Sequence, residues 1–168
     1  MNLVKPKIAH YKAVMEADRD FERAGEEPYC GASGRVGYMG WLLLLDRQSK
    51  PECMDYGSNP NEIYFLMDDE EKKIYGFGQL RPYDTVDVLT WAGHIGYSVR
   101  PSRRRRGYAT RMLAAALEVC RELGLSRVMI ASDSENAASA RTIERCGGVM
   151  ENEVPEDGRL TRRYWIDL

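Results

Sequence analysis

A loop rich in arginine and glycine is the part of this sequence whose residue types and spacing most clearly indicate chemistry. Residues 104–109 read Arg-Arg-Arg-Gly-Tyr-Ala, between an expected strand and an expected helix. Free N–H groups at a helix start attract anions, and a glycine lets backbone approach a ligand without a Cβ. The four arginines at 103–106 add positive charge at the same place. The pattern predicts a phosphate-binding loop.

Two regular elements must position this loop. Before it, Ile95, Tyr97 and Val99 alternate with smaller or polar residues, which predicts a strand over residues 93–100 that Pro101 ends. After it, apolar residues recur at helical spacing, which predicts a helix from about residue 107 that ends at Gly124. The loop therefore joins a strand to a helix start.

Further elements follow from periodicity and turn residues. We expect a surface helix within residues 9–24, a mobile glycine-rich loop over 25–40, a short helix over 39–45 and an irregular connection over 49–61. Beyond these we expect a hairpin of strands 63–67 and 74–80, a strand over 127–131, a helix over 136–146 and a final strand over 160–166. The order predicts an α/β fold in which a mixed central sheet is flanked by helices.

The loop and its surroundings resemble the GNAT superfamily of N-acetyltransferases, of bacterial type. The signature of that family, (Arg or Gln)-x-x-Gly-x-(Gly or Ala), holds the pyrophosphate of acetyl-CoA, and Arg104, Gly107 and Ala109 match it. The resemblance covers about residues 62–150 and includes the motif Asn136-x-x-Ser139. It implies direct transfer of acetyl from acetyl-CoA to a primary amine, without a covalent enzyme intermediate. A non-catalytic acyl-CoA-binding sensor is the alternative.

The resemblance also implies where the cofactor binds. The strand ending at Val99 is expected to splay from the strand at 127–131, so that the pantetheine arm pairs with the backbone of residues 97–99. The N–H of Val99 would then stabilise the oxyanion of the reacting thioester. The implied cofactor-binding residues are Tyr97, Ser98, Val99, Arg104, Arg105, Arg106, Gly107, Tyr108, Ala109, Thr110, Asn136 and Ser139.

Catalytic side chains are less well defined. His94 is the candidate general base, because a neutral imidazole can take the proton of an ammonium; a histidine bonded across the sheet for structure is the alternative. Asn136 and Ser139 are also common helix-capping residues. The family often carries a tyrosine acid seven residues after the asparagine, where this chain has Ile143. Tyr164, Tyr108, Cys146 and water remain open as the acid.

The chain is expected to be one domain, with residues 1–61 on the acceptor side, 62–150 forming the cofactor core and 151–168 a C-terminal strand. Residues 1–90 carry 16 acids and 11 bases, whereas residues 91–168 carry 10 acids and 13 bases. This asymmetry would suit an anionic cofactor in the second half and a cationic acceptor near the first. A solvated surface gives the same counts.

Composition excludes several other classes. The 4 cysteines lie far apart and the 2 histidines form no pair, so we expect no metal. No apolar run approaches the roughly 20 residues of a membrane span, and the start is not a secretory signal, so we expect a cytoplasmic protein. The net charge of −2 argues against nucleic acid as the partner of the arginine run. The expected partner is a small-molecule or peptide amine, and a homo-oligomer is possible.

Overall fold

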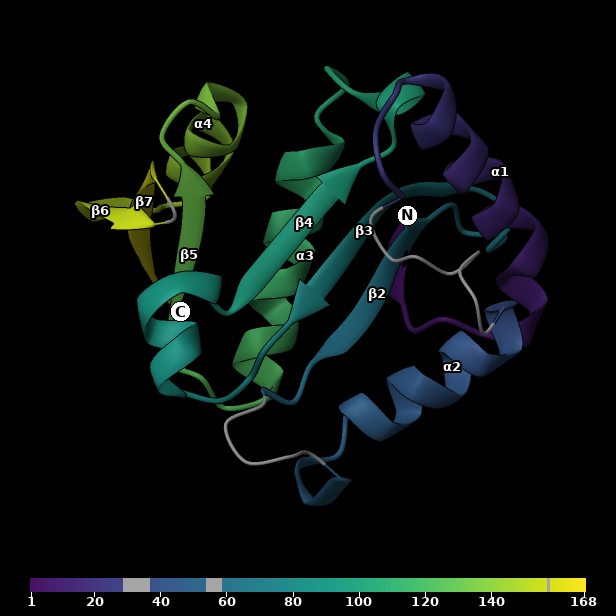
Figure 1. Ribbon diagram of the computed structural model, residues 1–168, viewed down its shortest axis with the longest axis horizontal. Coiled ribbons are helices and arrows are strands. Elements are labelled where there is room, and N and C mark those ends of the chain that lie inside the picture. The colour runs from purple at the N-terminus through teal and green to yellow at the C-terminus, as the bar shows by residue number, and fades with distance from the viewer. Residues whose placement is uncertain (29–36, 54–58, 157) are drawn as a thin grey trace.

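The computed structural model describes residues 1–28, 37–53, 59–156 and 158–168 (Figure 1). The strands are β1 (Asn2–Val4), β2 (Glu62–Met67), β3 (Ile74–Leu80), β4 (Ile95–Val99), β5 (Arg127–Asp133), β6 (Val149–Glu156) and β7 (Arg159–Asp167). The α-helices are α1 (Tyr11–Arg23), α2 (Gly37–Gln48), α3 (Tyr108–Glu122) and α4 (Ala137–Arg145). Short helices are η1 (Ile8–His10), η2 (Pro51–Cys53), η3 (Val88–Ala92) and η4 (Pro101–Arg103). This arrangement confirms the α/β class.

The strands form two sheets. One has the order β1-β2-β3-β4 and the other the order β5-β7-β6, and neighbouring strands within each are antiparallel. The expected hairpin is β2–β3, in which Phe65 lies opposite Phe77. The carboxylate of Asp68 accepts the N–H of Lys72 at 2.7 Å, which helps to close the charged turn. The sequence predicts a sheet that contains both parallel and antiparallel strands. In the structure the parallel pair is β4 and β5, which belong to different sheets and run in the same direction (Figure 1).

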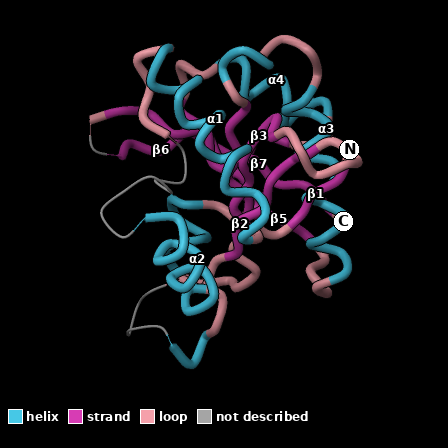
Figure 2. Tube along the Cα trace, turned by 90° about the vertical axis from the view of Figure 1, so that its right-hand side faces the viewer, coloured by secondary structure: helices cyan, strands magenta, loops and turns pink. Residues whose placement is uncertain are grey.

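Helices cover both faces of the first sheet. Successive side chains of β2 point to opposite faces, so that Phe65 packs in a cluster with α1 and α2, while Tyr64 packs in a second cluster with α3 and α4. Figure 2 shows the strands between these two groups of helices. Burial on both faces explains why β2 reads as a continuous apolar run.

The two sheets meet at His94. Its N–H donates to the carbonyl of Met129 in β5 at 2.7 Å, and the N–H of Met129 donates to Nδ1 of His94 at 2.9 Å. Gly93 has φ +69°, and a Cβ there would lie 3.0 Å from backbone atoms of Met129 and Ala131, so this close approach requires glycine. From this junction β4 and β5 diverge (Figure 1). We call residues 95–99 and 129–133 together the β4–β5 fork.

Several sequence-based expectations need correction. The C-terminal segment is a β6–β7 hairpin rather than one strand, and Pro155 with its neighbouring glutamates obscured the period of β6. The three-residue β1 and the π-helix η3 were also missed, and α2 is longer than the expected helix 39–45, so that residues 37–40 of the expected loop are helical. Residues 29–36 of the expected mobile loop and 54–58 of the expected connection lie outside the described residues.

Candidate functional site

The backbone of β4 presents alternate residues to the fork. At one end of the strand, the carbonyl of His94 accepts a hydrogen bond from the residue after β3 at 2.8 Å; at the other, the N–H of Arg100 donates to a β3 carbonyl at 3.0 Å. Hydrogen-bonding directions alternate along a strand, so the even-numbered residues between them bond to β3. The N–H groups of Tyr97 and Val99 therefore face away from β3, toward the fork.

The arginine-rich loop ends in an uncapped helix start. Arg105 and Gly107 have positive φ values of 60° and 77°. Gly107 is the N-cap of α3 and has no side chain to accept the first helical N–H groups, and a Cβ placed there would meet no atom within 4 Å. These groups and the positive end of the helix dipole are thus available to an anion, as the sequence predicts. The pyrophosphate site expected here stays a prediction.

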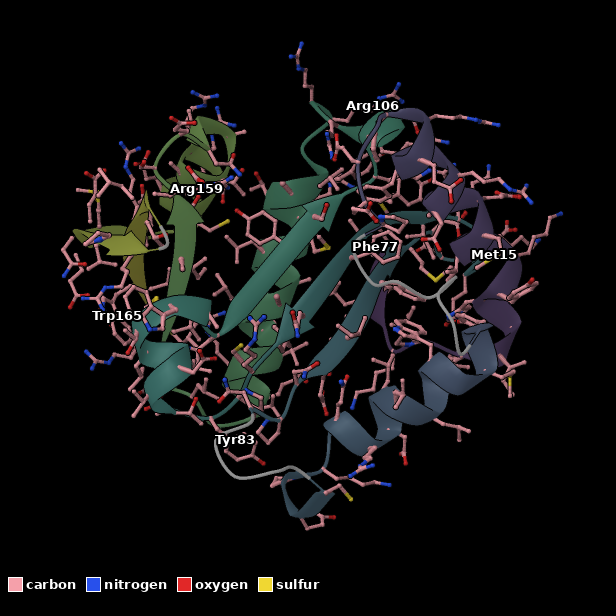
Figure 3. All side chains as sticks on the ribbon, viewed as in Figure 1. Met15, Phe77, Tyr83, Arg106, Arg159 and Trp165 are labelled. Carbon is pink, nitrogen blue, oxygen red and sulfur yellow. The ribbon has the colours of Figure 1, made fainter. Side chains whose placement is uncertain are left out.

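The arginines of the loop have different roles. Arg104 forms a two-pronged ion pair with Glu26, at 2.5 and 2.6 Å, and its Nε donates to the carbonyl of Val99 at 3.1 Å. The guanidinium of Arg103 lies 5.5 Å from the centre of the Tyr75 ring. Arg105 and Arg106 are exposed, and Figure 3 shows Arg106 at the loop. The signature residue Arg104 is therefore engaged within the protein, whereas its two successors face solvent.

Two acidic residues, Asp20 in α1 and Glu26 shortly after it, bind residues of the loop and of the segment before it. The carboxylate of Asp20 accepts hydrogen bonds from Arg100 Nε and Ser102 N–H, both at 3.0 Å. Burial raises the pKa of Asp20, but these hydrogen bonds outweigh it and hold the pKa below its usual value. Glu26 also has a lowered pKa, chiefly because Arg104 donates to it. Sequence reasoning missed both acids, because no spacing pattern links residues about 80 positions apart.

His94 is buried, with both ring nitrogens engaged. Its Nδ1 accepts the N–H of Met129, so in the neutral ring the proton lies on Nε2, which donates to Asp84 at 2.8 Å. Such a ring has no lone pair left to accept a proton from a substrate. This arrangement is the one expected of a histidine that is hydrogen-bonded between strands for structure. The general-base role of His94 stays a prediction, and it requires one of these bonds to break.

Asn136 and Ser139 stand at the start of α4. The side chain of Asn136 accepts the N–H of Ser139 at 3.0 Å, so Asn136 caps α4. The hydroxyl of Ser139 lies 3.1 Å from the hydroxyl of Tyr97, which connects β4 to α4. Burial raises the pKa of Tyr97. Sequence reasoning considered Tyr97 only for its backbone, and alternation alone could not reveal this contact.

The residues considered as the acid occupy different environments. Ile143, at the position where the family often has tyrosine, is fully buried, and Tyr164 is buried in the same core. The ring of Tyr108 packs against that of Tyr75, with centroids 4.8 Å apart. The thiol of Cys146 lies at the first turn of α3, and burial raises its pKa. Tyr97 differs from these residues, because it lies on the fork and its hydroxyl contacts Ser139 of α4.

Within the described ranges, no group of three or more histidine, cysteine, aspartate or glutamate side chains could hold a metal ion. In the same part of the chain, no helix combines the length and apolar character needed to cross a membrane.

Comparison with known proteins identifies the family of this chain. Residues 2–149 match the family model described as the acetyltransferase (GNAT) domain. An L-methionine sulfoximine/L-methionine sulfone acetyltransferase of Pseudomonas paraeruginosa is 26% identical over 147 residues, which cover 86% of this chain and 70% of the relative.

Solved structures share the fold at low identity. A ribosomal-protein-S5-alanine acetyltransferase of Vibrio fischeri is 17% identical, with a TM-score of 0.72 over 98% of this chain and 91% of its own. A spermidine N-acetyltransferase of Vibrio cholerae, in complex with CoA and spermine, is 16% identical, with a TM-score of 0.66 over 99% and 94%. With a family match over most of its length, the chain belongs to the GNAT acetyltransferases and is an acetyl-CoA-dependent N-acetyltransferase.

Proposed function

We propose that this enzyme binds acetyl-CoA along β4 and the loop before α3, and transfers the acetyl group directly to a primary amine at the β4–β5 fork. One observation carries the proposal: the N–H groups of Tyr97 and Val99 and the uncapped start of α3 are presented in succession along one stretch of chain. Such a row of donors suits a long ligand with amide carbonyls and a pyrophosphate.

Residues of the loop hold the anionic part of the ligand in this proposal. The first N–H groups of α3, from Tyr108 to Thr110, bind the pyrophosphate, and exposed Arg105 and Arg106 add charge. Gly107 provides a close approach, while Arg104 supports the loop through Glu26. Ser98, Ala109, Asn136 and Ser139 complete the proposed contacts.

Acetyl-CoA supplies an acetyl group already activated as a thioester. The N–H group of Val99 polarises the carbonyl of this group and stabilises the charge that develops on its oxygen as the amine attacks, while the N–H group of Tyr97, two residues away on the same edge of β4, pairs with the pantetheine arm. As the C–S bond breaks, the hydroxyl of Tyr97, which lies beside Ser139, supplies a proton to the departing thiolate, and the proton lost by the attacking nitrogen passes through water to restore that hydroxyl. His94 holds the junction of β4 with β5, which fixes the direction of the β4 donors.

The acceptor is a small amine in this proposal. The Pseudomonas paraeruginosa relative is named for two amino-acid derivatives, which favours a small molecule over a peptide. In this proposal the chain forms one domain, in which residues 1–61 are the acceptor side, residues 62–150 the cofactor core and residues 151–168 a C-terminal part. The absence of a metal, a cytoplasmic location and a homo-oligomer also stay predictions.

A panel of amines tests transfer against the sensor alternative. CoA release from acetyl-CoA is measured with each amine, and the product mass is determined. At least one amine should gain the mass of an acetyl group at a rate that depends on enzyme concentration. CoA binding by calorimetry without acetylation of any amine in a broad panel would favour the sensor.

A further inference from the structure

A cavity of about 580 Å³ lies between η3, the end of β5 and the start of β7, and its lining includes Trp91, Asp133 and Arg159. We propose that this cavity is the acceptor site and that it recognises a free amino acid as a zwitterion. Asp133 binds the ammonium group, Arg159 binds the carboxylate and Trp91 contacts the side chain. This proposal rests on the transfer at the β4–β5 fork proposed above.

The cavity lies beside the fork. The β5 residues Val128 and Ile130 pack in the core with α3, and Asp133, three residues beyond Ile130, has the opposite side-chain direction. Asp133 also lies four residues, or about 13 Å, beyond the junction at Met129. Figure 3 shows Arg159 beside the same end of β5. The cavity thus flanks the stretch of fork toward which the β4 donors are turned.

The cavity presents one acid and one base. Among the described residues that line it, Asp133 and Arg159 carry the charges, with 3.7 Å between their nearest charged atoms. The side chain of Arg159 is 81% exposed, so this long pair is weak and a ligand can replace it. The second oxygen of Asp133 accepts the N–H of Glu135 at 2.8 Å, which fixes the carboxylate.

The aromatic wall is held in place. Trp91 lies on η3, whose carbonyl at Leu89 accepts a hydrogen bond from Arg163 Nη1 at 3.4 Å. Arg81 donates to the carbonyl of Ala92 at 3.3 Å. Trp91 is nevertheless 38% exposed, so part of its ring is available to an apolar group.

These features select among acceptors. The volume lies within the range of about 300–1,000 Å³ usual for small-molecule sites. A protein N-terminus has no carboxylate next to its amine and would leave Arg159 without a ligand group. A dication would place its second charge near Arg159. A zwitterion matches both ends of the pair.

The test compares amino acids with amines that lack the carboxylate, such as methionine with 3-(methylthio)propylamine. The amino acid should have a kcat/KM about 10²-fold higher, because a charged hydrogen-bonding site discriminates strongly against a ligand without its partner. Arg159→Gln should remove this preference by lowering kcat/KM for the amino acid alone. Exposed Arg159 can be replaced without disturbing the core.

Arg162→Gln is the matched control, because Arg162 lies on the other face of β7 and pairs with Glu153 at 2.6 Å. It should leave the preference unchanged. Equal loss for both substrates in Arg159→Gln, or a preference for the decarboxylated amine, would overturn the zwitterion proposal while transfer itself stands. If no amine is acetylated, the transfer proposal fails. Calorimetry of methionine binding with CoA present then tests the cavity by itself. A methionine affinity that Arg159→Gln leaves unchanged would overturn the zwitterion proposal.

Discussion

The cofactor loop and the proposed acceptor cavity lie on either side of the fork but are built in different ways. The loop and the first turn of α3 are consecutive residues whose backbone N–H groups are the binding groups. The cavity combines three segments, η3, β5 and β7, and depends on side chains. A binding site made of backbone has a short sequence signature, whereas a site assembled from distant side chains has none. Variants on each side can test this contrast.

The largest effect is expected at Gly107. Gly107→Glu places bulk and negative charge where the pyrophosphate should bind, so CoA affinity measured by calorimetry should fall by about 10²-fold or more. Gly124→Glu is the matched control, since Gly124 also has positive φ and open space, at the other end of α3. It carries the same backbone strain without the ligand. Equal CoA affinities in the two folded variants would remove the loop from the site.

Tyr97→Phe should lower kcat by about 10-fold and leave CoA affinity intact, if its hydroxyl protonates the leaving thiolate. Tyr64→Phe provides the comparison, because it also deletes a tyrosine hydroxyl that is hydrogen-bonded, here to Glu62 at 2.6 Å. Tyr64 lies on β2, outside the fork. Similar turnover in wild type and Tyr97→Phe would contradict the acid role.

His94 joins the two regions, and its replacement decides between structure and base catalysis. If it is structural, His94→Gln should lower stability by about 2 kcal/mol, a decrease in Tm of about 5 °C, and keep the acidic limb of the kcat/KM profile. A kcat reduced by about 10² and loss of that limb, with unchanged Tm, would instead establish the base.

His10 serves as the control for this experiment. It is also buried, its Nδ1 accepts the N–H of Lys7 at 3.2 Å, and its Nε2 lies 2.9 Å from Glu71. His10→Gln should therefore lower Tm to a similar extent without affecting the pH profile.

The smallest effect is expected at Glu26, which pairs with Arg104 of the loop. Glu26→Gln should weaken CoA binding by about 3-fold, because a partly exposed ion pair contributes at most about 1 kcal/mol. The pKa of Glu26 is lowered in the folded state, so its stabilisation is complete above the unfolded pKa and is lost as pH falls through the folded value. The Tm difference from wild type should be complete at pH 7 and should decrease as pH falls below the unfolded pKa of about 4.3.

Glu153→Gln removes another ion pair, with Arg162, away from the fork. It should leave CoA affinity unchanged. A Tm difference for Glu26→Gln that is as large at pH 3 as at pH 7 would show that packing, rather than charge, explains the effect.

The sequence by itself predicted the elements that carry the proposed cofactor-binding groups. Alternation at Ile95, Tyr97 and Val99 and the glycine at 107 are local patterns, and β4, the loop and α3 follow them closely. The hairpin β2–β3 was predictable for the same reason. Local backbone geometry is encoded by neighbouring residues, so one stretch of sequence suffices.

Only the tertiary structure decided the rest. The partners of Arg104 and Arg100, the engagement of both nitrogens of His94 and the approach of Asp133 to Arg159 all join residues that are distant along the chain or carried by different elements. Such contacts depend on how the sheets pack, and periodicity reports only which face of an element is buried. The cofactor could therefore be inferred from the sequence, whereas the proposed acceptor site required the fold.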